Sequence, residues 1–348
     1  MAENGGASAR TRGAKRPRSQ VAAPRVVVVG ASAGGFAAIK ALASELPPSF
    51  PAAVFVVLHV APSFPAQPYV ASLDRISGIR WKLAVDGERI VASTAYVAPP
   101  DAHMLVKERT ILITKGAHEN RYRPGIDPLF RSAAVSHGSS VIGVVLTGML
   151  DDGTSGLEAV ARCGGLTIVQ DPADAAFPQM PQSALEHVKV HYRVKLAELG
   201  ALLERLVRTR VAKRTRAPED VAIEALIAER VVSDVHAADT LGEQVPYNCP
   251  DCGGVLWQMS KPKALRYRCH VGHAFTAASL LETQSQKIEE TLWVTLRMLE
   301  ERRNLADSMA KRATAGLSRI AEARAREADV HIKRIRDILG AGGHPVRR

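Results

Sequence analysis

The stretch VVVVGASAGG, at residues 26–35, decides the predicted fold. A run of valines that stops at a glycine is typical of a strand buried on both faces, and the segment FAAIKALASELP that follows has helical spacing. Comparable apolar runs occur at residues 52–60, 141–149 and 166–171. Strands that alternate with helices predict an α/β protein with a doubly wound, mainly parallel sheet and helices on both faces. Shorter alternating segments near residues 80–115 predict an antiparallel insertion or edge.

The rest of the chain divides into segments of different composition. We expect a disordered basic tail at 1–24, an α/β domain at 25–205, a basic linker and helix at 206–245, a small Cys/His module at 246–275, and a helical region at 276–348. Apolar residues three, four or seven positions apart in the last segment predict a helical hairpin or a coiled coil.

Composition narrows the class of protein. The chain has 348 residues and a net charge of +11, and its basic residues gather in the tail, the linker and the C-terminal helices. We interpret these as solvated arms, so nucleic acid is not an expected partner. No apolar run approaches the roughly 20 residues that span a bilayer, and the N-terminus lacks the apolar core of a signal peptide. We therefore expect a cytoplasmic protein without membrane insertion.

Ser32, within the pattern GASAG at residues 30–34, has three competing interpretations. A phosphate cradle is disfavoured, because a dinucleotide fingerprint needs glycine at Ser32 and an acid about 20 residues later. A turn serine that caps the following helix is the ordinary role of serine at such a place. The pattern also fits G-x-S-x-G, in which the serine is a nucleophile, and this interpretation requires a base and an orienting acid.

Polar residues at two further strand ends could supply these groups. His59 ends the second predicted strand, and Asp151 and Asp152 follow the third in a glycine-rich turn. Because the carboxyl ends of parallel strands line one crevice, Ser32, His59 and one of the aspartates are expected to meet there. Each residue alone has an ordinary explanation, since a buried histidine can be structural and Asp-Gly is common turn chemistry.

Six motifs occur in order between about residues 25 and 190: GASAGG, LH followed by APSF, YVAPPDAHM, RPGIDPLFRSAA, LTGMLDDGTSGL and QDPADAAFPQMPQSAL. This ordered set resembles the catalytic domain of chemotaxis protein-glutamate methylesterases of the CheB type. The resemblance implies a serine hydrolase that demethylates glutamyl γ-methyl esters on chemoreceptor proteins and releases methanol, with glutamine deamidation as a second activity in some members. The resemblance also implies that this enzyme needs no cofactor for catalysis.

The resemblance also implies a role for individual residues. Ser32 corresponds to the nucleophile, His59 to the base, and Asp152, which directly precedes the glycine, to the orienting acid. The backbone N–H of Met149 corresponds to a group that holds the oxyanion. The family pattern usually has glycine where this chain has Leu150, and we expect this small departure to alter the loop.

Two further expectations concern binding of the substrate and regulation of the enzyme. Arg121 and Arg123 lie in ENRYRPGIDPLF and are candidates for binding an acidic receptor, although solvated arginines beside a strand would look the same. Related methylesterases commonly carry an N-terminal receiver domain, whereas only a 24-residue basic tail precedes the first predicted strand here. The expectation is a stand-alone form that is controlled by another protein or is constitutively active.

The Cys/His segment predicts a metal site. Cys249 and Cys252 form a C-x-x-C knuckle, and Cys269 follows with a histidine at either position 270 or 273. This set suits tetrahedral zinc, and the Cys-x-x-x-His spacing favours His273 as the fourth ligand. With four protein ligands the zinc would be structural, in a ribbon that docks signalling partners and resembles the C-terminal module of some stand-alone methylesterase-like proteins. A non-catalytic docking scaffold is therefore the alternative function.

Overall fold

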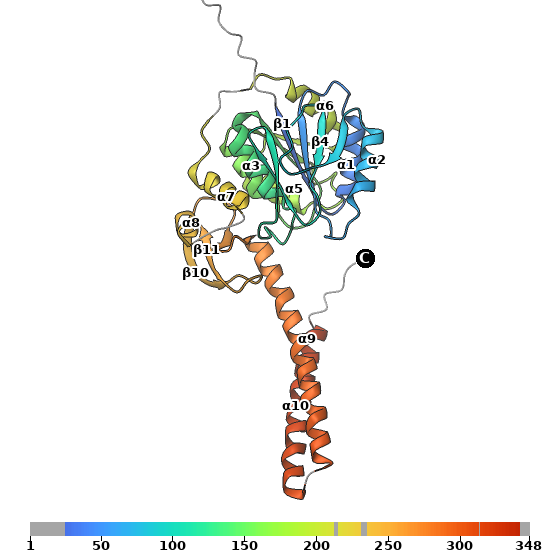
Figure 1. Cartoon of the computed structure of the whole chain (residues 1–348), viewed down its shortest axis with the longest axis vertical. Coiled ribbons are helices and arrows are strands. Elements are labelled where there is room, and N and C mark those ends of the chain that lie inside the picture. The colour runs from blue at the N-terminus through green and yellow to red at the C-terminus, as the bar shows by residue number, and fades with distance from the viewer. Residues whose placement is uncertain (1–24, 212–214, 231–234, 313, 342–348) are drawn as a thin grey trace, which may run out of the picture.

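The structure is a computed structural model, and it describes residues 25–211, 215–230, 235–312 and 314–341 (Figure 1). The expected tail at 1–24 lies outside these residues. Seven strands form the central sheet in the order β3-β4-β2-β1-β7-β8-β9, and every neighbouring pair is parallel. The strands are β1 (Val26–Ala31), β2 (Ala53–Leu58), β3 (Arg80–Leu83), β4 (Thr94–Val97), β7 (Val141–Val145), β8 (Leu166–Gln170) and β9 (Tyr192–Val194). The predicted doubly wound, mainly parallel sheet is confirmed.

The prediction of an antiparallel segment near residues 80–115 was wrong for its first half. Strands β3 and β4 extend the main sheet in parallel, and only β5 (His103–Lys107) and β6 (Thr110–Thr114) form a separate antiparallel hairpin. Alternating hydrophobicity reports which face of a strand is buried. The direction of pairing depends on the path of the connecting chain, which periodicity does not reveal.

Helices cover both faces of the sheet and divide the core into two layers. On one face lie α1 (Gly35–Glu45), α2 (Ala66–Ile76) and α6 (Leu196–Val207); on the other lie α3 (Ile126–His137), α4 (Thr154–Arg162) and α5 (Gln179–His187). The valines of β1 alternate between the layers, with Val27 and Val29 in the first and Val26 and Val28 in the second. A strand buried on both sides needs the continuous valine run that the sequence contains.

Strand β1 is the point at which the direction of winding changes. It pairs with β2 on one side and with β7 on the other, so the strands up to β4 lie on one side of β1 and those from β7 onward lie on the other. Loops after neighbouring strands diverge at such a switch point and leave a crevice at the carboxyl edge of the sheet. The residues that follow β1, β2 and β7 are therefore brought together at that edge.

The second half of the chain begins with two helices, α7 (Glu219–Arg230) and α8 (Val235–Leu241), on either side of residues 231–234. A four-stranded antiparallel sheet follows, which we call the Cys/His sheet. Its strands are β10 (Gly242–Asn248), β11 (Val255–Met259), β12 (Arg266–Cys269) and β13 (Ala274–Thr276). Helices α9 (Ala277–Ala310) and α10 (Ala315–Ala341) then form a long hairpin that projects away from the α/β domain (Figure 1).

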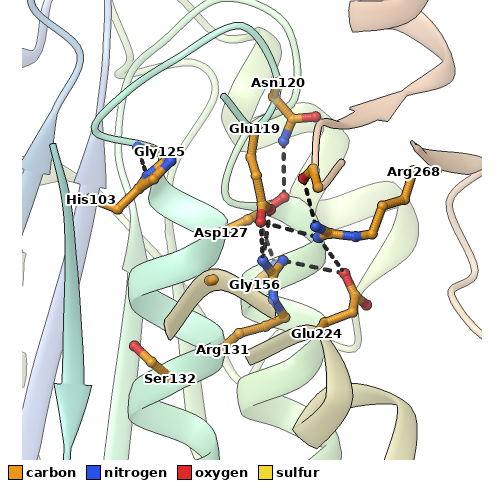
Figure 2. Close-up of polar contacts among 12 residues, drawn as sticks. His103, Glu119, Asn120, Gly125, Asp127, Arg131, Ser132, Gly156, Glu224 and Arg268 are labelled. Carbon is orange, nitrogen blue, oxygen red and sulfur yellow. Dashed lines mark hydrogen bonds and ion pairs between the residues drawn. The ribbon is translucent and has the colours of Figure 1, made fainter. Parts of the chain in front are cut away.

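A buried ion-pair cluster joins the Cys/His sheet and α7 to the α/β domain. Arg131 on α3 contacts Glu119 at 2.7 Å, and Arg268 on β12 contacts both Glu119 at 3.0 Å and Glu224 of α7 at 3.1 Å (Figure 2). Arg266 on β12 also pairs with Glu224, at 3.0 Å. Burial alone would raise the pKa of Glu119, but Arg131 and Arg268 outweigh it and lower that pKa to about 2. The carboxylates of Glu119 and Glu224 are therefore both charged. Their ion pairs fix how the Cys/His sheet packs on the α/β domain.

No helix among the described residues combines the length and the apolar character that crossing a membrane would require.

Candidate active site and Cys/His cluster

Three side chains form a hydrogen-bonded series at the carboxyl edge of the central strands. Ser32 follows β1, His59 follows β2, and Asp152 lies in the turn after β7. The Oγ of Ser32 lies 3.1 Å from Nδ1 of His59, and Nε2 of His59 lies 2.8 Å from Oδ2 of Asp152. The side chains of His59 and Asp152 are only 3% and 2% exposed. The structure thus brings together the three residues that the sequence pattern placed at three strand ends.

The ring of His59 has one nitrogen available to accept a proton from Ser32. A carboxylate accepts hydrogen bonds only, so Nε2 must carry the proton that is donated to Asp152. The lone pair of Nδ1 then faces the Ser32 hydroxyl. This is the arrangement that a general base needs, with the acid fixing the tautomer of the imidazole.

Close packing around Ser32 explains the small residues in its neighbourhood. Gly34 adopts a left-handed φ of 76°, which permits the sharp turn from β1 into α1. A Cβ on Gly148 would lie 2.0 Å from Sδ of Met180 and 2.9 Å from the Cβ of Ser32, so any larger residue there must displace its neighbours. The amide of Ser32 donates to the carbonyl of Thr147 at 3.0 Å and ties the ends of β1 and β7 together.

Asp152 is held by donors on every side. Its Oδ1 accepts from Nδ2 of Asn120 and from the amide of Gly153, each at 2.9 Å, and its Oδ2 accepts from the amide of Ile126 at 2.8 Å. Burial acts to raise the pKa of Asp152, but the hydrogen bonds from His59, Ile126 and Asn120 outweigh it and hold that pKa below its ordinary value. Asp152 is therefore a fixed carboxylate that can orient an imidazole.

A second buried carboxylate, Asp127, lies beside Asp152. Its Oδ1 accepts from the amides of Gly153 at 3.1 Å and Gly156 at 2.6 Å, so it satisfies the N-terminal end of α4. Its Oδ2 accepts from Nδ2 of Asn120 at 3.0 Å (Figure 2). Burial and the charge of Asp152 raise the pKa of Asp127. The side-chain amide of Asn120 thus bridges two carboxylates.

Asn120 and Tyr122 are contacts of the site that the sequence interpretation did not single out. The ring of Tyr122 stacks on that of His59, with centroids 3.6 Å apart and an interplanar angle of 11°. Both residues lie in the ENRYRPGIDPLF motif, beside the two arginines that are candidates for substrate binding. A signal was present in the polar character of this loop, but nothing in the sequence relates it to His59 or Asp152.

The two aspartates of the LDDG turn have different partners. Asp152 faces His59, whereas Oδ1 of Asp151 accepts a hydrogen bond from the hydroxyl of Thr276 at 2.8 Å. Thr276 is the last residue of the Cys/His sheet. Asp151 therefore contacts the Cys/His sheet and not the imidazole.

The loop after β7 also presents Met149 at the edge of the site. Among the described residues the Met149 amide has no hydrogen-bond partner, and its side chain is exposed. Leu150, which stands where the family pattern has glycine, adopts a left-handed φ of 60°. For a residue with a Cβ this conformation costs about 1–2 kcal/mol. Its amide donates to Oε1 of Gln179 at 2.9 Å, which helps to hold the loop.

The two arginines proposed for substrate binding have partners within the chain. The guanidinium of Arg123 donates to Oδ1 of Asp101, at 2.6 Å from Nη2, and to the carbonyl of Gly116 at 2.9 Å. Arg121 lies 3.8 Å from Glu282 at the start of α9. Arg123 therefore braces its own loop, and Arg121 faces the helix that follows the Cys/His sheet.

Four potential metal ligands converge in the Cys/His sheet. The ligand atoms of Cys249, Cys252, Cys269 and His273 all lie within 4.8 Å of one another. Sγ of Cys252 and Sγ of Cys269 are 3.8 Å apart, and Nδ1 of His273 is 3.6 Å from Sγ of Cys269. Tetrahedral zinc with Zn–S bonds of about 2.3 Å places sulfur ligands about 3.8 Å apart, so the donor set and spacing fit that ion.

His270 and Cys163 lie apart from this cluster. The ring of His270 is directed at Trp257, with centroids 6.1 Å apart in an edge-on arrangement. Cys163 is fully buried in the core of the α/β domain. The other ring nitrogen of His273, Nε2, lies 3.9 Å from Oδ2 of Asp251. Carboxylates in this position commonly orient histidines that bind a metal.

A hydroxyl, an imidazole and a buried carboxylate in series are the arrangement that serine hydrolases use, and here they lie at the switch point of a doubly wound sheet. Comparison with known proteins gives the family: the model of the CheB methylesterase family matches residues 27–203, and the chain belongs to that family.

Relatives and a solved structure agree with this assignment. The chain is 35% identical over 189 residues to a Leptospira interrogans protein named "Putative protein-glutamate methylesterase/protein-glutamine glutaminase", a match that covers 54% of this chain and 97% of the relative. A protein-glutamate methylesterase/protein-glutamine glutaminase of Ralstonia nicotianae is 37% identical over 51% of this chain and 47% of its own length. The CheB methylesterase catalytic domain of Thermotoga maritima superimposes with a TM-score of 0.51 and 32% identity over 53% of this chain and 99% of that domain.

Proposed function

We propose that the chain hydrolyses glutamyl γ-methyl esters on receptor proteins of a chemotaxis or related sensory pathway, with Ser32 as the nucleophile. The observation that carries the proposal is the continuous series from Ser32 through His59 to Asp152. Membership of the CheB methylesterase family supports the choice of substrate. None of the described cysteines forms a disulfide, which suits the reducing cytoplasm in which we expect the chain to act.

The geometry supports a two-step acyl transfer. Nδ1 of His59 takes the proton of the Ser32 hydroxyl as its oxygen attacks the ester carbonyl, and Asp152 stabilises the imidazolium that forms. The amide of Met149 is the proposed donor to the oxyanion of the tetrahedral intermediate. His59 returns the proton to the departing methanol, and then activates a water that releases glutamate and regenerates Ser32.

The same machinery accommodates glutamine. Attack of Ser32 on a side-chain amide gives the same acyl-enzyme, with ammonia as the leaving group after protonation by His59. We therefore propose glutamine deamidation as a second reaction of the same site.

We further propose a structural zinc ion at Cys249, Cys252, Cys269 and His273. Four protein ligands leave no open coordination position for a substrate, so this metal would stabilise the Cys/His sheet and take no part in ester hydrolysis. The sheet and the α9–α10 hairpin also offer surfaces on which other signalling proteins could dock.

Release of methanol from a methyl-labelled receptor fragment tests the enzymatic proposal. The full chain should release methanol, and the Ser32→Ala variant should lose this activity while it melts at an unchanged temperature. If neither protein releases methanol and an active-serine phosphonate fails to label Ser32, the alternative of a non-catalytic scaffold is favoured. A matched Ser308→Ala variant, altered on the exposed hairpin, controls for the substitution itself.

A further inference from the structure

The loop that carries Asn120 and Tyr122 is held in place by the Cys/His sheet. The amide of Asn120 donates to the carbonyl of Ala274 at 2.8 Å, and the amide of Ala274 donates to the carbonyl of His118 at 3.3 Å. Glu119 and Ala274 form a parallel β-bridge. The loop is thus paired with the edge of β13, although more than a hundred residues lie between them in the chain.

The side chain of Asn120 joins this sheet to the candidate active site. Its Oδ1 accepts from the amide of Thr276 at 3.0 Å and from the hydroxyl of Ser279 at 3.3 Å, both from the C-terminal half of the chain. Its Nδ2 donates to Asp152 and to Asp127. Donors on one side and carboxylates on the other fix the orientation of the amide, since a flipped side chain would lose all four contacts. Asn120 is only 3% exposed.

Two additional contacts connect the same elements. The hydroxyl of Thr276 donates to Asp151, the residue immediately before Asp152. Tyr122, two positions beyond Asn120, packs flat against the ring of His59. The Cys/His sheet therefore reaches both the acid and the imidazole of the series through one loop and one turn.

We propose that Asn120 is a positioning residue through which the Cys/His sheet holds Asp152 in its productive orientation, so that the triad is complete only when that sheet is docked. The inference rests on the proposed function in that it takes Ser32 as the nucleophile. It goes beyond that function because it assigns the C-terminal module a part in the chemistry of the α/β domain.

The physical consequence follows from the contacts of Asp152. Without Asn120, Oδ1 loses its side-chain donor, and the two neighbouring carboxylates face each other without the amide that bridges them. Asp152 then keeps only its backbone donors, the amides of Ile126, Asp127 and Gly153. Its carboxylate can shift relative to Nε2 of His59, and the ring is less firmly restrained with Nδ1 toward Ser32. Misplacement of a catalytic group by about 1 Å costs on the order of 10²-fold in rate.

The metal cluster is adjacent in sequence to these contacts. His273 directly precedes Ala274, and the carbonyl of His273 accepts from the amide of Cys269 at 3.0 Å. A change at Cys252, which lies on the opposite knuckle, should loosen β13 and release the loop. The Cys252→Ser substitution therefore perturbs the sheet without touching any residue of the proposed active site.

The test is the rate at which a fluorophosphonate labels Ser32 in the full chain, which needs no receptor substrate. Asn120→Ala should slow labelling by roughly 10- to 100-fold while the final labelled fraction stays unchanged. Loss of folded protein would instead lower the final fraction at an unchanged rate. With a small ester such as p-nitrophenyl acetate, the loss should fall on kcat and leave KM unchanged. Asn304→Ala, on the exposed hairpin, is the matched control.

A double-mutant cycle tests whether the sheet acts through Asn120. Cys252→Ser should slow labelling several-fold in the otherwise unchanged chain and add little in the Asn120→Ala background. Thr276→Val, which removes the hydroxyl that donates to Asp151 and accepts from the amide of Ser279 at the start of α9, serves as a second perturbation of the sheet. The proposed coupling would be overturned if the two substitutions slowed labelling independently, so that their fold-changes multiplied. It would also be overturned if the Cys252→Ser variant were labelled at the original rate.

The outcomes also separate this inference from the proposed function. If the chain without substitutions is labelled at Ser32 but releases no methanol, the proposal of a methylated receptor as substrate is overturned. The double-mutant cycle then still tests the role of Asn120. If the chain without substitutions and the Asn120→Ala variant are labelled at the same rate, only the positioning role of Asn120 is overturned. A chain in which Ser32 is never labelled overturns both.

Discussion

Arg268 on β12 and Glu119 in the loop before α3 form a buried ion pair at 3.0 Å, although 149 residues separate them in the sequence. Glu119 also pairs with Arg131, and Arg268 with Glu224, so each charge has two partners. Charges removed from water are tolerated only with such compensation. The pair therefore commits the Cys/His sheet to one position on the α/β domain.

Removal of one charge from this cluster should be costly. The Glu119→Gln substitution leaves Arg131 and Arg268 buried with too little negative charge, and we expect a loss of about 3–5 kcal/mol in the free energy of unfolding. Urea denaturation measures it. The control is Glu301→Gln, which removes the partner of exposed Arg297 at 2.7 Å and should cost at most about 0.5 kcal/mol. Equal losses in the two variants would contradict the role assigned to burial.

The same cluster predicts a loss of stability in acid. The folded-state pKa of Glu119 is lowered to about 2, and that of Glu224 is also lowered, because buried arginines surround both carboxylates. Carboxylates with lowered pKa values stabilise the fold above their unfolded pKa, and this contribution disappears as pH falls toward the folded value. The free energy of unfolding should therefore decline between about pH 4.5 and 2, and Glu119→Gln should flatten that decline. Superimposable profiles would refute the assignment.

The tautomer of His59 gives a kinetic prediction. In Asp152→Asn an amide can donate to Nε2, which favours the tautomer whose proton sits on Nδ1, facing Ser32. We expect kcat for ester hydrolysis to fall by about 10⁴-fold with little change in KM, as when the orienting acid of other triads is replaced. Asp151→Asn is the neighbouring control, and its smaller effect should show that the two aspartates are not interchangeable.

Close packing of Gly148 against Ser32 gives a steric prediction. A Cβ at position 148 would lie 2.0 Å from Sδ of Met180 and 2.9 Å from the Cβ of Ser32, so Gly148→Ala must displace Met180 and also the serine or the loop after β7. We expect phosphonate labelling of Ser32 to slow by about 100-fold. Gly316→Ala, where the added Cβ meets nothing within 4 Å, should leave labelling unchanged. If Gly148→Ala is labelled as fast as the original chain, close packing at position 148 does not constrain Ser32.

The proposed zinc site predicts a difference between two neighbouring histidines. Purified protein should contain one zinc ion per chain, His273→Ala should lose most of it, and His270→Ala should retain it because that ring faces Trp257. Metal analysis after dialysis measures both. Zinc retained in His273→Ala, or lost equally in both variants, would contradict the ligand set.

Much of the α/β domain follows from local pattern. The valine run of β1 requires burial on both faces, and Gly34 beyond the strand permits a sharp turn, so a sheet with a polar residue at its edge could be predicted. The pairing direction of β3 could not, because hydrophobic alternation is the same in parallel and antiparallel strands. The spacing of the cysteines likewise predicts a metal site without specifying what the site packs against.

By itself the sequence determined the alternation of strands and helices, the positions of Ser32, His59 and Asp152 at strand ends, and the spacing of the cysteines, because these depend on residues close together in the chain. Only the tertiary structure decided that Asn120 bridges Asp152 and the Cys/His sheet, and that Glu119 meets Arg268. The contacts of Asn120 and Glu119 with the Cys/His sheet join residues more than a hundred positions apart, and their partners are set by the path of the folded backbone and by the cost of burying unpaired charge.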